Sequence, residues 1–169
     1  VAYHPRPMKL GRIVWGLTLA GAASAVGRAS STPEGRAIDR ELFDLLNDGS
    51  RPGLERLSFA VTELGSLYAA GGAAAAIALG GRRRQAASAI AAAGATWLVL
   101  QGAKKLVRRP RPYQADPEGT RRLVAEPNGS SWPSSHPMVL AAFTSVAGRE
   151  LGLGATARTG LTALATSVA

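Results

Sequence analysis

The sequence Gly102–Met138, GAKKLVRRPRPYQADPEGTRRLVAEPNGSSWPSSHPM, separates two long apolar segments of the chain. Seven of its side chains are cationic and three are acidic, and it contains one of the two histidines of the protein. A dense group of positive charges between apolar segments predicts a binding site for an anion at the surface where those segments end.

The two Arg-Pro pairs, at 109–110 and 111–112, stiffen the first half of this stretch. A residue that precedes proline is held out of the α-helical region, so we expect Arg111 on extended backbone. Arginine offers a planar fork that matches two phosphate oxygens, whereas a lysine such as Lys104 supplies a compact charge. Together they are typical of a phosphate site.

The second half ends in Ser134, Ser135 and His136, directly before an apolar run. A serine at the start of a helix caps its free N–H groups, and the positive end of the helix dipole also favours an anion. The imidazole of His136, in the first turn, can donate a proton to a leaving oxygen.

These residues carry a resemblance to a known family. Lys104, followed after six residues by Arg111-Pro112, resembles the first signature of the type 2 phosphatidic acid phosphatase superfamily. Residues 133–136, Pro-Ser-Ser-His, resemble its second signature, with Ser135 where glycine is usual. The superfamily includes lipid phosphate phosphatases, bacterial acid phosphatases and vanadium haloperoxidases.

The resemblance implies a role for each matched residue. Lys104 and Arg111 would bind the phosphate oxygens, together with Ser134 and the backbone amide of Ser135. His136 would be catalytic and would protonate the leaving group. Neither a metal nor another cofactor is expected.

The third signature of the family, a Ser-Arg pair followed by a nucleophilic histidine and an aspartate, has no match here. The only histidines are His4 and His136, and residues 149–169 contain none. Eleven uncharged residues follow Arg158, whereas a membrane helix needs about 20. We therefore expect a fragment that stops inside a helix, with the nucleophile beyond Ala169.

The apolar segments outside the central stretch predict the fold class. They cover residues 13–27, 57–81, 85–103 and 134–153, and a shorter one follows Arg158. We expect an all-α transmembrane bundle of about five helices, the last incomplete, in a single domain spanning 1–169. A secretory signal peptide is the alternative for 13–27.

Between the first two segments, Leu42, Phe43 and Leu46 predict a short amphipathic helix that ends near Asn47–Gly49.

The basic turn Arg82-Arg83-Arg84 predicts the topology. Positive charge favours the cytoplasmic side, so residues 104–136 should lie on the extracytoplasmic face of a multi-pass protein of the cell membrane. A net charge of +9 implies anionic partners, and the apolar runs favour membrane lipids over nucleic acid. With no cysteine, a disulfide or thiolate metal site is excluded. Nothing in the sequence indicates the oligomeric state.

The sequence thus predicts an integral membrane phosphatase that hydrolyses a lipid phosphate or diphosphate, such as undecaprenyl diphosphate or phosphatidic acid, through a phosphohistidine. Two alternatives share the pocket: a soluble secreted acid phosphatase and a vanadate-dependent haloperoxidase. A third is a non-enzymatic basic membrane protein that binds anionic lipid.

Overall fold

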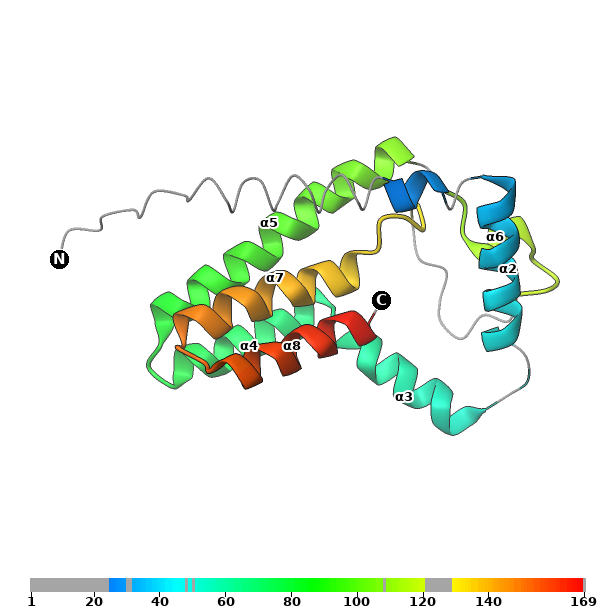
Figure 1. Ribbon diagram of the computed structural model, residues 1–169. Helices are drawn as coiled ribbons and strands as arrows, with labels where there is room; N and C mark the ends of the chain where they lie inside the picture. The colour runs from blue at the N-terminus through cyan, green and yellow to red at the C-terminus, as the bar shows by residue number, and fades with distance from the viewer. Residues whose placement is uncertain are drawn as a thin grey trace. The chain divides into compact units, whose positions relative to one another are not determined.

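The computed structural model describes residues 25–29, 32–47, 49, 51–107, 109–120 and 129–168. The named helices are α2 (Pro33–Asn47), α3 (Pro52–Glu63), α4 (Leu67–Leu79), α5 (Arg83–Val107), α6 (Pro112–Ala115), α7 (Ser135–Glu150) and α8 (Ala155–Ser167) (Figure 1). No strand occurs among these described residues, and the predicted all-α class is confirmed.

The chain divides into two compact units, Val1–Gly49 and Ser50–Ala169. In the first unit, α2 confirms the predicted amphipathic helix. The Thr32 hydroxyl accepts a hydrogen bond from the Gly35 amide at its start, and Gly49 has a positive φ of 72° beyond its end. Most of the predicted first membrane helix, residues 13–24, lies outside the described residues. That residues 1–169 form a single domain remains a prediction.

In the second unit, α5 and α7 pack side by side, α4 packs on α5, and α8 packs on α7 (Figure 1). Alanines make up six of the eight residues in the main core cluster, which comprises Ala70, Ala74, Ala86, Ala89, Ala93, Val139, Phe143 and Ala147. Such small side chains allow the helix backbones to approach closely. This packing brings the end of α5 near the start of α7.

The predicted apolar segment 57–81 does not form one helix. α3 ends at Glu63, and α4 begins after Ser66, whose hydroxyl accepts a hydrogen bond from the Ala69 amide at 3.1 Å. α4 therefore has 13 residues and a length of about 20 Å, short of the roughly 30 Å of a bilayer core. The expectation of one continuous membrane helix over 57–81 is wrong, because a capped corner divides it.

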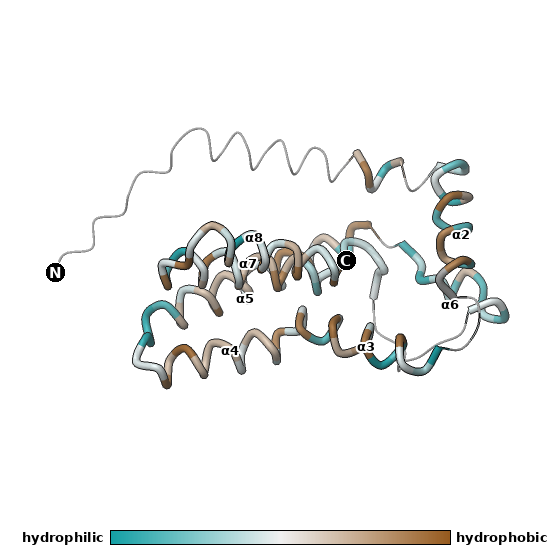
Figure 2. Tube along the Cα trace, turned by 60° about the horizontal axis from the view of Figure 1, so that its bottom comes forward, coloured by the Kyte–Doolittle hydropathy of each residue, from teal (hydrophilic) through white to brown (hydrophobic). Residues whose placement is uncertain are grey.

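Among the described residues, one helix, α5, is long and apolar enough to cross a membrane. Only 22% of its apolar window is buried inside the protein. Figure 2 shows apolar residues along α4 as well and hydrophilic residues at the turn into α5. We expected about five membrane helices. In the part of the chain that the structure describes, one helix has the length and the composition of a membrane span, so the five are not confirmed.

Candidate functional site

Lys104 joins the two predicted motifs. It lies in the last turn of α5, one residue beyond the predicted membrane span 85–103, and its Nζ donates a hydrogen bond to the Ser135 hydroxyl at 3.4 Å. Partial burial lowers the pKa of Lys104, and the positive charge of Arg111 lowers it further. Two predicted cations therefore lie close enough to repel each other, and an anion bound between them would relieve that repulsion.

Hydrogen bonds hold the segment 109–111 against the segment 129–132. The Arg109 amide donates to the Ser130 hydroxyl at 2.8 Å, and the Ser131 amide donates to the Arg109 carbonyl at 3.0 Å. The Ser131 hydroxyl donates to the Pro110 carbonyl at 3.0 Å. These bonds position the Arg-Pro motif beside the residues that lead into α7.

Arg111 occupies the residue before α6. Its φ of −85° and ψ of 157° are extended, as the following proline predicts. Its Nε donates to the Gly129 carbonyl at 3.1 Å, and its backbone amide donates to the Gln114 side chain at 2.9 Å. The first bond fixes the plane of the guanidinium, so a bidentate bond to phosphate would use the terminal nitrogens.

Ser134 and Ser135 start α7 but do not cap it as expected. Ser134 is the N-cap residue, yet its side chain makes no capping hydrogen bond. Ser135 is buried, with 9% of its surface exposed, and its hydroxyl accepts the bond from Lys104. The prediction of a serine cap is therefore wrong. Pro137, at the third helical position, has no N–H that the Ser134 hydroxyl could cap. The first N–H groups of α7 lack a side-chain cap.

His136 is half-buried in the first turn of α7. Its ring makes no hydrogen bond with any residue in the described part of the chain, so no direct link joins the imidazole to Lys104 or Arg111. Its backbone packs against Gly65 at the α3–α4 corner, where a Cβ would lie 2.6 Å from the His136 carbonyl oxygen. The sequence did not predict that Gly65 contacts the site. A glycine between apolar residues does not indicate which distant residue it will pack against.

A cavity of about 640 Å³ adjoins Lys104. Among the described residues, three cations line it, Lys104, Lys105 and Arg109, and no carboxylate does. The other lining residues are Gln101, Pro110, Gln114, Gly129 and Ser130. Arg111 and the residues 134–136 are not part of the lining. From the sequence, Arg109 had no predicted role in binding, because only Arg111 follows Lys104 at the spacing of the first signature.

Three other cations of the central stretch, Arg108, Arg121 and Arg122, lie outside the described residues. Within the described ranges, no group of three or more histidine, aspartate or glutamate side chains is placed to hold a metal ion. The site as described can attract and hydrogen-bond an oxyanion through lysine, arginine, serine and amide groups.

Comparisons of this chain with protein-family models, with curated proteins and with solved structures find no match. Any assignment of function therefore depends on the residues and geometry of the site itself.

Proposed function

We propose that this chain is the phosphate-binding part of an integral membrane phosphatase of the type 2 phosphatidic acid phosphatase superfamily. The observation that carries the proposal is the hydrogen bond from Lys104 to Ser135, with the charge of Arg111 close by. It joins residues 31 positions apart in the sequence, one from each of the two motifs.

In the proposed mechanism, Lys104 and Arg111 neutralise the non-bridging oxygens of a phosphate. The Ser134 hydroxyl, which is not used as a helix cap, and the Ser135 amide donate to the same group. His136 protonates the leaving oxygen as the phosphorus–oxygen bond breaks. Attack on phosphorus would come from a histidine that this sequence does not contain, so the chain alone is expected to bind phosphate and not to hydrolyse its esters.

A lipid phosphate or diphosphate is the proposed substrate class, with the site at the extracytoplasmic face of a multi-pass membrane protein. Support comes from the apolar side chains that α4 and α5 expose: Leu79 is 90% exposed and Leu106 is 86% exposed. Leu98 and Val99 are also exposed, within α5, the candidate membrane helix of the described residues. Apolar surface of this extent is stable in contact with lipid.

Titration of the detergent-solubilised chain with inorganic phosphate and with orthovanadate tests the site. Arg111→Lys should weaken binding of either oxyanion by about tenfold or more, because the charge remains but the fork is lost. Arg51→Lys, at an exposed arginine before α3, is the matched control and should bind like wild type. Wild-type affinity in Arg111→Lys would contradict the bidentate role.

Phosphate release must be measured with this chain joined to a segment that supplies the attacking histidine, because the sequence itself does not contain one. There, His136→Ala should retain oxyanion binding but lose phosphate release, because only the proton donor is removed. Phosphate release at the wild-type rate would exclude His136 as the acid.

The short helix α4, of 13 residues, favours one second candidate, a soluble acid phosphatase with the same oxyanion site. Extraction distinguishes the two: the membrane enzyme should require detergent, and the soluble enzyme should not.

A further inference from the structure

A second cavity, of about 650 Å³, lies along the C-terminal half of α7 and the length of α8. It is remote from the candidate phosphate site. Ser135 and Arg149 are 14 residues apart on α7, which corresponds to about 21 Å along the helix axis. Binding in this groove is therefore independent of the proposed phosphatase activity.

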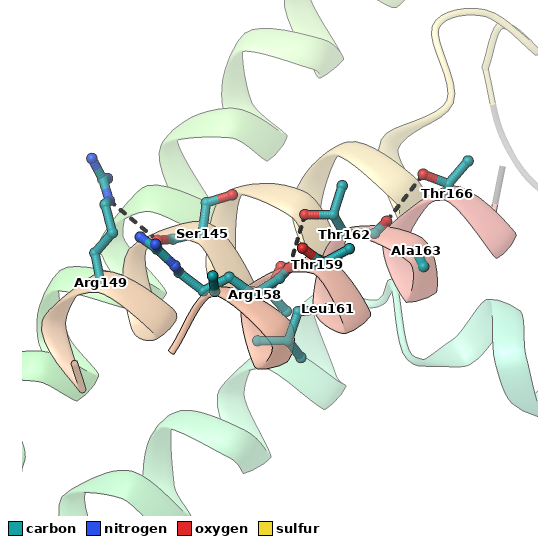
Figure 3. A pocket seen from close by; sticks show the side chains of 10 residues that line it. Ser145, Arg149, Arg158, Thr159, Leu161, Thr162, Ala163 and Thr166 are labelled. Atoms are coloured by element: carbon teal, nitrogen blue, oxygen red, sulfur yellow. Dashed lines mark hydrogen bonds between the residues drawn. The ribbon is translucent and has the colours of Figure 1, made fainter. Parts of the chain in front are cut away.

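Two arginines form one end of this groove, and Figure 3 shows both side chains there. The Arg149 Nε donates to the Ser145 carbonyl at 3.2 Å, which leaves the terminal nitrogens for a ligand. The aliphatic part of Arg158 crosses Gly148, where an added Cβ would lie 3.3 Å from the Arg158 Cγ. Neither guanidinium is paired with a carboxylate in the part of the chain that the structure describes.

Away from the arginines, three of the four threonines that line the groove use their hydroxyl hydrogens within the helices. The hydroxyls of Thr162 and Thr166 donate to the carbonyls of Arg158 and Thr162, each at 3.0 Å, and Thr144 donates to the Leu140 carbonyl at 2.7 Å. Because these hydrogens are used within the helices, these three threonines have no hydroxyl hydrogen left to donate to a ligand. Leu161 and Ala163 extend the same lining (Figure 3).

A groove that is cationic at one end and apolar along its length matches an amphiphile with an anionic head. We propose that it binds an anionic phospholipid, with the headgroup phosphate between Arg149 and Arg158 and part of one acyl chain along α8. From Arg158 to Thr166 the helix offers about 12 Å of groove for that chain. Free phosphate would use the arginines but leave the apolar part in contact with water.

Thermal unfolding of the detergent-solubilised protein with added lipid tests this site. Phosphatidylglycerol should raise the Tm, and phosphatidylcholine should raise it far less. Inorganic phosphate can use only the arginines of this groove, so any shift that depends on Arg149 and Arg158 should be much smaller with phosphate than with phosphatidylglycerol. In Arg149→Gln/Arg158→Gln, the phosphatidylglycerol concentration that gives half of the Tm shift should increase at least about tenfold, since two charge-assisted bonds are lost. Each variant is compared with its own lipid-free Tm, so a loss of basal stability does not obscure the result.

Two further variants separate this site from general attraction to a protein of charge +9. Arg82→Gln/Arg83→Gln removes the same charge from the exposed α4–α5 turn and should retain the wild-type response. Ala163→Phe fills the groove without changing charge and should reduce the response to phosphatidylglycerol. An equal shift with phosphatidylcholine would overturn the proposal, and so would a wild-type response to phosphatidylglycerol in Arg149→Gln/Arg158→Gln and in Ala163→Phe.

Discussion

Gly65→Ala should destabilise the second unit and disturb the start of α7. Gly65 is buried at the α3–α4 corner, and a Cβ there would lie 2.6 Å from the His136 carbonyl oxygen and 2.7 Å from its carbonyl carbon. Ordinary van der Waals contact begins near 3.4 Å, so one of the two backbones must move by about 0.8 Å. Neither is a flexible side chain that could rotate away.

The magnitude follows from the cost of overpacking a close contact, about 1–3 kcal/mol. Against a total stability of roughly 5–15 kcal/mol, this is a large fraction. For a unit of this size, 1 kcal/mol corresponds to about 4 °C in Tm, so a fall of about 4–12 °C is expected. Movement of His136 would also displace Ser135, which lies within hydrogen-bond distance of Lys104, so oxyanion binding should weaken.

The assay is thermal unfolding followed by far-ultraviolet circular dichroism, together with orthovanadate titration. Gly72→Ala is the control: Gly72 is exposed within α4, and a Cβ there meets nothing within 4 Å. Alanine at that position should stabilise the helix by up to about 1 kcal/mol. A Tm at or above wild type for Gly65→Ala, with unchanged vanadate affinity, would refute the close approach of the corner to α7.

Two more predictions concern single side chains. Ser66→Ala removes the cap of α4 and should cost about 1 kcal/mol in urea unfolding, whereas Ser58→Ala, exposed within α3, should change stability by less than about 0.5 kcal/mol. The second concerns pH. Because the pKa of Lys104 is lower in the folded protein than in the unfolded chain, the unfolded state binds more protons between the two values. Stability should therefore rise as the pH increases through the lowered pKa toward the ordinary lysine value. Lys104→Met should lose this rise in urea unfolding at alkaline pH, and Lys105→Met should keep it; an unchanged profile in Lys104→Met would contradict the assignment.

Local patterns in the sequence predicted several features that the structure has. The apolar stripe and the glycine of residues 42–49 predicted α2 and its end, because capping and helical periodicity act between near neighbours. The extended backbone of Arg111 followed from the proline after it, through a steric clash between adjacent residues. The all-α class followed from the long apolar segments.

Other features depend on partners distant in the chain. The corner at Leu64–Ser66 resembles the rest of an apolar helix in sequence, and the space that Gly65 leaves is filled by the backbone of His136, about seventy residues later. The direction of the Ser135 hydroxyl is likewise decided by Lys104 and not by the helix that it begins. The cavity beside Lys104 includes Arg109, which the spacing of the signature left out.

By itself, the sequence determined the class of the fold, the concentration of positive charge in residues 102–138 and the residue types able to bind an oxyanion, because each depends on composition or on interactions between neighbours. Only the tertiary structure decided which of those cations approach one another, where the long apolar segment breaks and which arginines border the α7–α8 groove. Those outcomes depend on close packing between helices, whose contacts join residues with no regular spacing along the chain.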